Sequence, residues 1–512
     1  MRLNKLLEGL EYEIKDMTGK TLSISDADRE VSGVVNDSRK VTAGSLFLCI
    51  KGTNFDGHDA AEGAVKDGAC VIVAERDPVF SAEAGADCVI VKTPDTRKAM
   101  AYIAAAWFDH PADKLTTIGI TGTKGKTTTS YMIRSMLQNA GKKCGLIGTV
   151  EVIIGDEHIH AGNTTPESLL LQEYMARMVE KGLDSVVMEV SSQGLMLHRT
   201  DAINFDIGIF TNIEADHIGP GEHKDFGDYL RCKSLLFRQC KRGILNADDA
   251  HVDDILEGHT CKVTTFGIGQ GADLRAVNLA YMHKPGELGV IFDTEGEVKV
   301  HAQVPTPGRF SVYNALCAIA VAGELGVDAD GIVNALRNIS VKGRIEMVPV
   351  SDEFTVMIDY AHNAMALKSL LTTLRDYHPA RLICLFGCGG NRARDRRFEM
   401  GEVSGKLADL TIITSDNPRF EEPLDLIADI VTGIKRTDGE YVTVPDRREA
   451  IRYALSIAER GDILVLAGKG HEDYQEIKGE KFPMDERVIL KEILEKEPEL
   501  AKGAEPPEAE VI

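Results

Sequence analysis

The sequence has no C-x-x-C pair, no apolar run long enough to cross a membrane, and a deficit of positive charge. Its 10 cysteines are scattered along the chain, so we expect free thiols in a reducing compartment rather than a disulfide framework or a cysteine-bound metal. The missing apolar run argues against a membrane helix, and residues 1–10 lack the apolar core of a signal peptide. A net charge of −22, from 58 Lys and Arg against 80 Asp and Glu, disfavours nucleic acid and anionic membranes as partners. These absences predict a cytoplasmic protein that binds anions only in local basic pockets.

The chain of 512 residues is too long for one hydrophobic core, and its length predicts about three domains. Short apolar runs alternate with helical stretches, which favours α/β domains with mainly parallel sheets and helices on both faces. We expect a smaller N-terminal α/β domain, a central domain with a P-loop-type sheet, a Rossmann-like C-terminal domain and a disordered tail. The expected ranges are 1–110, 111–342, 343–495 and 496–512.

A glycine-rich loop between an apolar strand at 115–120 and a helix is the most informative segment. Gly122 and Gly125 let backbone N–H groups converge on an anion. Lys126 brings a positive charge to the β- and γ-phosphates, and Thr127 offers a hydroxyl to Mg²⁺. An ordinary glycine turn is the alternative, but the strand–loop–helix context favours ATP binding. The residues expected to contact ATP here are Gly122, Thr123, Lys124, Gly125, Lys126, Thr127 and Thr128.

Polar residues follow the next buried strands of the central domain. Glu189 ends the strand at 185–190, and its carboxylate suits Mg²⁺, although a capping or ion-paired role is the alternative. His217 lies shortly after the strand at 205–211, where a solvated loop histidine is the simpler interpretation. Lys233 lies on an amphipathic stretch and, taken alone, reads as a surface cation.

The third domain carries polar turns after four predicted strands, at 356–359, 382–386, 410–414 and 463–467. The glycines before Arg392 resemble an anion-binding turn, and Arg419 on an Asn-Pro turn suits a carboxylate. Plain turns and a solvated helix face are the alternatives. Arg394, Arg396 and Arg397 have no assigned role.

Together, and in this order, these motifs resemble those of the Mur ligase family. They are Asp37-Ser38-Arg39, GTKGKTTT at 122–129, Asn163-Thr164-Thr165-Pro166, EVSSQGL at 189–195, FTNIEADH at 210–217, Lys233, Asn246-Ala247-Asp248-Asp249, DYAHNA at 359–364, GCGGNR at 387–392, DNPR at 416–419 and GKGHE at 468–472. The chain departs from the family pattern at Asn363-Ala364 and at Asn391.

The resemblance implies roles residue by residue. Glu189, His217 and Thr127 match Mg²⁺ ligands, and Lys233 matches a lysine that the family carries as a carbamate, so that it too serves the metal. With Lys126 they form the implied catalytic set, and Asn246, Arg344 and Asp359 match adenosine contacts. The residues matching the UDP end of the substrate are Ser38, Thr53, Asn54 and Phe55, and those matching its muramoyl-dipeptide are Asn163, Thr164, Thr165, Ser191 and Arg199. The residues matching the amino-acid site are Arg392, Asp416, Asn417, Pro418, Arg419, Gly468 and Glu472.

The family further implies an ATP-dependent amide ligase, with Mg²⁺ as cofactor and an acyl phosphate as intermediate. Its implied partners are UDP-N-acetylmuramoyl-dipeptide, ATP and diaminopimelate, handled by a monomer. L-lysine as the amino acid, a folylpolyglutamate-synthase-like ligase and a P-loop ATPase with a regulatory role remain alternatives. Arg419 discriminates among them, because it suits a second carboxylate that lysine lacks.

Overall fold

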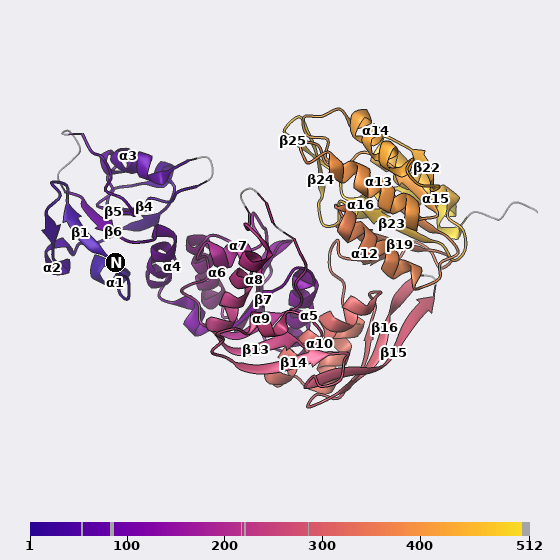
Figure 1. Cartoon of the computed structure of the whole chain (residues 1–512), viewed down its shortest axis with the longest axis horizontal. Helices are drawn as coiled ribbons and strands as arrows, with labels where there is room; N and C mark the ends of the chain where they lie inside the picture. Colours follow the sequence, from indigo (N-terminus) through magenta and orange to yellow (C-terminus); the bar gives the residue numbers. More distant parts are fainter. Residues whose placement is uncertain (53–54, 82–86, 217, 220–221, 285, 504–512) are drawn as a thin grey trace, which may run out of the picture. The chain divides into compact units, whose positions relative to one another are not determined.

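Parallel strands alternate with helices along most of the chain, which confirms the predicted α/β class (Figure 1). The computed structural model describes residues 1–512 except 53–54, 82–86, 217, 220–221, 285 and 504–512. The described chain divides into two compact units, Met1–Ala272 and Asp273–Ile512, and each is considered by itself. Within the described ranges, no helix combines the length and the apolar character needed to cross a membrane.

The first unit begins with a six-stranded sheet in the order β2-β1-β6-β5-β4-β3. Strands β3 to β6 run parallel, and β1 joins β6 antiparallel. Buried aliphatic residues on both faces of this sheet form its two small cores. Its elements are α1 (Leu3–Leu6), β1 (Glu13–Asp16), β2 (Thr21–Leu22), α2 (Ile24–Ala27), β3 (Gly33–Val35), η1 (Ser38–Lys40), β4 (Ser45–Leu48), η2 (Gly57–Ala60), α3 (Ala61–Lys66), β5 (Val71–Ala74), β6 (Val89–Lys92), α4 (Thr96–Trp107) and η3 (Pro111–Lys114).

The larger sheet of the first unit follows the order β10-β9-β8-β11-β7-β12-β13-β14. From β8 to β14 neighbouring strands are parallel, so their carboxyl ends meet at one edge, where ligands bind in such sheets. The elements are β7 (Thr116–Thr121), α5 (Lys126–Asn139), β8 (Cys144–Ile147), β9 (Glu151–Ile154), β10 (Glu157–His160), α6 (Ser168–Glu180), β11 (Ser185–Glu189), α7 (Ser192–Met196), β12 (Phe205–Phe210), α8 (Phe226–Ser234), η4 (Leu235–Arg238), β13 (Cys240–Asn246), α9 (Val252–Ile255) and β14 (Lys262–Gly267).

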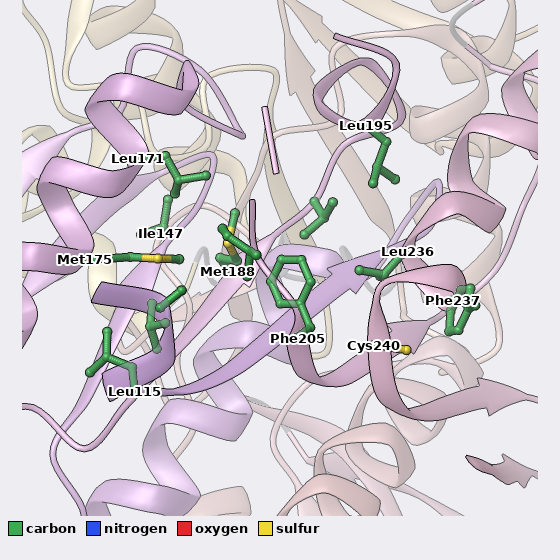
Figure 2. Close-up of a cluster of buried hydrophobic side chains, with 14 of the residues drawn as sticks. Leu115, Ile147, Leu171, Met175, Met188, Leu195, Phe205, Leu236, Phe237 and Cys240 are labelled. Atoms are coloured by element: carbon green, nitrogen blue, oxygen red, sulfur yellow. The ribbon is translucent and has the colours of Figure 1, made fainter. Parts of the chain in front are cut away.

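Close packing beneath this sheet explains why β7 contains a glycine. Figure 2 shows the ring of Phe205 between Met188 and Leu236 in the core of buried side chains. A Cβ at Gly119 would lie 2.9 Å from that ring, closer than packed carbon atoms approach. Gly119 therefore lets β7 and β12 pair while the large ring stays buried.

The second unit carries a six-stranded sheet in the order β18-β19-β23-β20-β21-β22, which is parallel except for β18. One core forms under α12 to α14 and a second under α15 and α16, so helices cover both faces. An antiparallel meander of β15, β16 and β17 precedes this sheet; the sequence analysis did not predict it. The elements are β15 (Leu274–Lys284), β16 (Glu287–Glu295), β17 (His301–Val304), α10 (Arg309–Glu324), α11 (Ala329–Arg337), β18 (Glu346–Val348), β19 (Thr355–Asp359), α12 (Ala364–Arg375), β20 (Leu382–Phe386), α13 (Asp395–Leu407), β21 (Leu410–Ile413), α14 (Pro423–Ile434), β22 (Glu440–Thr443), α15 (Arg447–Ile457), β23 (Ile463–Ala467), β24 (Tyr474–Ile477), β25 (Glu480–Pro483), α16 (Glu486–Lys496) and η5 (Pro498–Lys502).

The beginning of the predicted tail is structured. Residues Pro498–Lys502 form a 3₁₀ helix, and the Ala501 carbonyl accepts a hydrogen bond of 2.5 Å from the Ser351 hydroxyl. Disorder from residue 496 onward was therefore wrong for this part, because its backbone is anchored to the sheet's edge. Residues 504–512 lie outside the described part.

All 10 cysteines are free thiols, and each except Cys70 is buried. Burial raises the pKa of the Cys49 and Cys88 thiols to about 12. These side chains behave as small apolar residues of the core.

Candidate active site

The glycine-rich loop connects β7 to α5 as the sequence predicts. Gly122 has a φ of +148° and Gly125 a φ of +87°, values that glycine adopts without strain. A Cβ at Gly122 would lie 1.9 Å from the Thr211 hydroxyl oxygen. The loop therefore requires glycine for its turn and for its close approach to the residues that follow β12, and it presents the amino end of α5.

Two residues after β12 hold this loop in place. The side-chain oxygen of Asn212 accepts a 2.9 Å hydrogen bond from the Lys124 amide, and the Thr211 hydroxyl donates to the Lys124 carbonyl over 2.7 Å. The Thr123 amide in turn donates to the Asn212 carbonyl over 2.9 Å. The sequence analysis quoted both residues within the FTNIEADH segment at the end of a predicted strand, but assigned neither of them this contact with the loop.

Two lysine side chains converge on one carbonyl oxygen of the loop. The Lys126 ammonium donates to the Gly122 oxygen over 2.8 Å, and the Lys233 ammonium donates to the same atom over 2.9 Å. Lys233 is only 1% exposed, so the reading of it as a surface cation was wrong. Burial, with the neighbouring charge of Lys126, lowers the pKa of Lys233 well below its ordinary value. The Lys233 nitrogen also lies 4.5 Å from the centroid of the Tyr229 ring.

Glu189 reaches the same edge of the sheet from β11. It lies opposite Ile120 of β7, and its two carboxylate oxygens accept hydrogen bonds of 2.9 Å from the amide and the hydroxyl of Thr149. Thr127 is buried in the first turn of α5. A carboxylate and a hydroxyl beside a phosphate-binding loop are the hard oxygen donors that Mg²⁺ prefers, so these residues fit that ion. His217 lies outside the described residues.

The residues matched to the muramoyl-dipeptide gather next to Glu189. The Thr165 hydroxyl donates to the Glu189 carbonyl over 2.9 Å and accepts a hydrogen bond of the same length from the Ser191 amide. Arg199 donates to the Thr165 carbonyl over 2.9 Å and pairs with Glu167. Its buried Nε has no hydrogen-bond partner in the described structure. Thr164 contacts Thr149 over 3.0 Å, and Asn163 is exposed.

The residues matched to the UDP end lie in the N-terminal sheet region. Ser38 begins η1 and is half-buried, and Phe55 is exposed. Thr53 and Asn54 lie outside the described residues.

A chain of hydrogen bonds joins α7 to α8 through His223. Its Nε2 lies 2.9 Å from the Ser192 hydroxyl and its Nδ1 lies 3.2 Å from an Asp228 oxygen. His223, Asp228 and Cys232 could in principle ligate a metal. However, Arg231 pairs with Asp228 over 2.7 Å and lies 3.5 Å from the Cys232 sulfur, and a guanidinium there disfavours a second cation. The cluster is better described as a strut between the two helices.

The residues matched to adenosine are divided between the units. In the first unit, the Asn246 side chain donates to the Thr211 carbonyl over 2.9 Å. In the second, Asp359 accepts hydrogen bonds of 2.8 Å from the Ile345 and Ala361 amides, and burial raises its pKa. The Arg344 guanidinium lies over the Tyr360 ring at 4.7 Å.

The residues matched to the amino-acid site gather at the carboxyl ends of β20, β21 and β23. Arg419 has a φ of +51°, and its guanidinium donates from Nη1 to the Gly390 carbonyl over 2.7 Å. Its Nε pairs with Glu476 over 3.1 Å. Gly390 approaches the turn so closely that a Cβ would lie 2.0 Å from the Pro418 carbonyl oxygen. The structure thus brings the GCGGNR and DNPR segments together, with Arg392 exposed on the former.

Lys469 is a buried cation that the sequence analysis overlooked. Its ammonium donates over 2.9 Å both to the Asn417 side chain and to Glu472, and it also donates to the Tyr474 carbonyl. Asn417 donates to the same Glu472 oxygen over 2.9 Å. Glu472 is therefore already paired within the chain, and a ligand ammonium would share it with Lys469.

Buried arginines form ion pairs near the carboxyl ends of these strands. Arg447 pairs with Glu486 over 2.8 Å and donates to the carbonyls of Ser415 and Ala467, which follow β21 and end β23. Asp416 lies beneath Gly468, where a Cβ would be 3.0 Å from its carboxylate. Of the unassigned arginines, Arg394 and Arg397 both pair with Asp429, and Arg397 also pairs with Glu421. Arg394 and Arg397 are therefore engaged in ion pairs within the second unit. Arg396 is half-buried.

Comparison with known proteins decides the family. Three family models match consecutive parts of the chain: "Mur ligase family, catalytic domain" over 30–108, "Mur ligase middle domain" over 120–322 and "Mur ligase, glutamate ligase domain" over 343–470. A protein of Caldanaerobacter subterraneus subsp. tengcongensis, named UDP-N-acetylmuramoyl-L-alanyl-D-glutamate–2,6-diaminopimelate ligase, is 44% identical over 96% of this chain and 99% of its own. The chain belongs to the Mur ligase family.

Further comparisons agree with this assignment to the Mur ligases. A Clostridium acetobutylicum protein, named as ligase 1 of the same activity, is 41% identical over 96% of this chain and 99% of its own. A solved structure of a UDP-N-acetylmuramoyl-L-alanyl-D-glutamate–2,6-diaminopimelate ligase is 29% identical, covers 92% of this chain and 96% of its own, and has a TM-score of 0.67. As a Mur ligase, this chain is an ATP-dependent, ADP-forming ligase.

Proposed function

We propose that this Mur ligase joins 2,6-diaminopimelate to UDP-N-acetylmuramoyl-L-alanyl-D-glutamate and so extends a peptidoglycan precursor. The observation that carries the proposal is similarity over nearly the full length, at 44% and 41% identity, to ligases named for that reaction. Arg419 on the DNPR turn suits the carboxylate of the amino acid, and the glycine-rich loop with Lys126 suits the phosphates of ATP.

In the proposed mechanism, the γ-phosphoryl group of ATP passes to the side-chain carboxylate of D-glutamate and ADP leaves. A deprotonated amine of diaminopimelate then attacks the acyl carbon, and inorganic phosphate leaves. The amides between Gly122 and Thr127 and the Lys126 ammonium neutralise charge on the transferring group, where positioning and electrostatics provide most of the catalysis. No side chain acts as a covalent nucleophile, because the activated group stays on the substrate.

Thr127, Glu189 and Lys233 are the described residues proposed to hold Mg²⁺, with His217 as a further candidate. When bound, Mg²⁺ supplies a positive centre that polarises phosphate oxygens. We further propose that Lys233 carries CO₂ as a carbamate. The convergence of two lysines on the Gly122 oxygen supports this, since a carbamate turns the repulsion between Lys126 and Lys233 into attraction.

The distal carboxylate of diaminopimelate is proposed to pair with Arg419, and its distal ammonium with Glu472. Lysine has the same distal ammonium but no carboxylate there, so it would leave the Arg419 guanidinium without that partner. A site that loses a buried polar contact can reject an analogue by a factor on the order of 10⁴. The remaining residues of the predicted set, Arg392, Asp416, Asn417, Pro418 and Gly468, shape the pocket around these two.

ADP release, measured with the UDP-muramoyl-dipeptide and a panel of free amino acids, tests the proposal. We expect turnover with diaminopimelate and a much lower kcat/KM with L-lysine, and the Arg419→Ala variant should narrow that preference. A wild-type enzyme that prefers lysine would overturn the choice of amino acid. Steady ATP turnover without any amino acid would instead favour an ATPase with a regulatory role.

A further inference from the structure

The hairpin of β24 and β25 is attached to the DNPR turn through polar contacts from β24. Gln475 donates to the Asp416 carbonyl over 2.7 Å and to the Ser415 hydroxyl over 3.1 Å. The Glu476 amide donates to the Asn417 side-chain oxygen over 2.9 Å. These two strands form a separate two-stranded sheet, so the contacts with the turn fix where the hairpin lies within this unit.

The backbone of Arg419 is held by the same hairpin. Its amide donates to the Glu476 carbonyl over 2.9 Å, and its carbonyl accepts a 2.6 Å hydrogen bond from the Lys478 amide. Arg419 adopts a left-handed conformation with a φ of +51°, which a non-glycine residue adopts only when its surroundings favour it. The paired strand therefore stabilises the left-handed backbone conformation of Arg419.

The Glu476 side chain then orients the guanidinium. Within the described structure, the hydrogen bonds of this group end on two acceptors: Nε on the Glu476 carboxylate at 3.1 Å and Nη1 on the Gly390 carbonyl at 2.7 Å. A guanidinium has five N–H groups in a rigid plane. Nη2 and the second hydrogen of Nη1 have no acceptor among the described residues, and N–H groups on these two nitrogens match the two oxygens of a carboxylate.

We infer that Glu476 is a positioning residue that fixes the Arg419 guanidinium with its Nη1–Nη2 edge toward the distal carboxylate of the amino-acid substrate. It thereby contributes to the choice of diaminopimelate over lysine. This inference rests on the proposed function, because it needs Arg419 to bind that carboxylate. Glu476 could also act in the opposite direction, because its negative charge repels the substrate carboxylate and would weaken binding. When Glu476 loses its carboxylate, the first effect predicts a higher KM for diaminopimelate and the second a lower one.

A set of matched variants separates them. Glu476→Ala should raise KM for diaminopimelate by about 10-fold or more and leave kcat within about 3-fold, because the contact positions the substrate and takes no part in bond making. The ratio of kcat/KM for diaminopimelate to kcat/KM for lysine should fall by a similar factor. Glu476→Gln should keep most of the wild-type selectivity, since an amide oxygen still accepts from Nε. Glu480→Ala, an exposed position in the same hairpin, is the control and should match the wild type.

A double-mutant cycle with Arg419→Ala gives the decisive readout. If Glu476 acts through Arg419, the double variant should have the same KM and the same selectivity as Arg419→Ala alone. Full additivity would overturn the inference, and so would a lower KM or unchanged selectivity in Glu476→Ala. Glu476→Leu, which keeps the apolar stem, replaces the alanine variant if thermal unfolding shows that alanine disorders the unit. If Arg419→Ala itself leaves selectivity unchanged, the proposed pocket fails instead, so the two failures are distinguishable.

Discussion

At the scale of single residues, two lysine side chains converge on the carbonyl oxygen of Gly122. Lys126 and Lys233 both donate to it, and two ammonium groups that share an acceptor repel one another. A buried amine with a lowered pKa beside a second lysine is unfavourable for stability, so it is a sign of function rather than of stabilisation. Under the proposed function, negative charge from phosphate and from the Lys233 carbamate relieves this repulsion.

Replacing Lys126 should abolish the ligase reaction while leaving the fold intact. Lys126→Ala removes the charge that meets the transferring phosphoryl group, and we expect kcat to fall by about 10³-fold, the scale of a lost transition-state donor. ADP release measures the rate, and circular dichroism checks the fold. The matched control is Lys262→Ala on the exposed start of β14. A near wild-type rate for Lys126→Ala would show that the phosphate-loop assignment is wrong.

Lys233→Ala should be nearly inactive, and small carboxylates added to it should restore part of the rate by replacing the carbamate anion. A second measurement does not depend on activity. Incubation with ¹³C-labelled bicarbonate should give a carbamate carbon resonance in the wild type that is missing from Lys233→Ala. Full activity of the alanine variant would contradict the carbamate, and so would the same resonance in both proteins.

His198 should make the stability of the first unit depend on pH. Its pKa is raised by a hydrogen bond of 2.7 Å to Asp201, helped by Asp95 and opposed by Lys98. The native state therefore favours the charged ring: the added stability is complete below the unfolded pKa of about 6.5 and is lost as pH rises through the higher folded value. We expect the thermal midpoint of the wild type to exceed that of His198→Gln more at pH 5.5 than at pH 8. An equal difference at both pH values would contradict this.

At the scale of elements, the sequence predicted the strands and helices that a local hydrophobic pattern marks. The strands at 382–386 and 463–467 coincide with β20 and β23, because each is an unbroken apolar run between turns. The hairpin of β24 and β25 escaped prediction since all of β25, Glu480–Pro483, is exposed and no hydrophobic period marks it. Glu476 was not predicted for a further reason. Its contact with Arg419 depends on pairing between segments that are far apart in the sequence.

The position of Lys233 shows the same limit. A helix was predicted around it, but its burial depends on how α8 packs against the loop after β7, which no local pattern records. The order of the motifs was enough to indicate the family, which the comparisons confirm. The partners that hold them, such as Thr149 for Glu189 and Lys469 for Glu472, became visible only in three dimensions.

The strut through His223 should contribute measurably to the packing of α7 on α8. His223→Ala leaves the Ser192 hydroxyl and the Asp228 carboxylate without this partner, and a lost buried contact of this kind costs about 1–3 kcal/mol. In a chain of this size that corresponds to a drop of a few degrees in the thermal midpoint of its unit. His158→Ala, which removes an exposed histidine paired with Glu151, is the control and should change little. Equal midpoints for the two variants would show that the strut adds no stability.

At the scale of the whole molecule, the candidate site residues are spread over the two units, with the phosphate loop in the first and the DNPR pocket in the second. Neither set suffices for a ligase that activates one substrate and captures another. The nucleotide should therefore bind detectably without the amino acid, while product formation should require all three substrates.

A non-hydrolysable ATP analogue with Mg²⁺ should raise the thermal midpoint of the first unit. Ligand binding to the native state adds about 2.7 kcal/mol at a ligand concentration of 100 times Kd. Differential scanning fluorimetry over a concentration series measures this shift. Lys126→Ala should lose most of it at the same concentrations, and an undiminished shift in that variant would place the nucleotide elsewhere.

The burial of the cysteines also makes the chain suited to site-specific labelling. Maleimides and similar reagents attack thiolates, and a thiol that is shielded and has a raised pKa supplies little of that form; burial raises the pKa of Cys144 to about 11. A cysteine introduced on an exposed edge, for example at Glu480, should therefore react well ahead of the nine buried thiols, and Cys70→Ser removes the one that is only half-buried. A pair of dyes attached in this way, one on each unit, would report the distance between the units as each substrate is added.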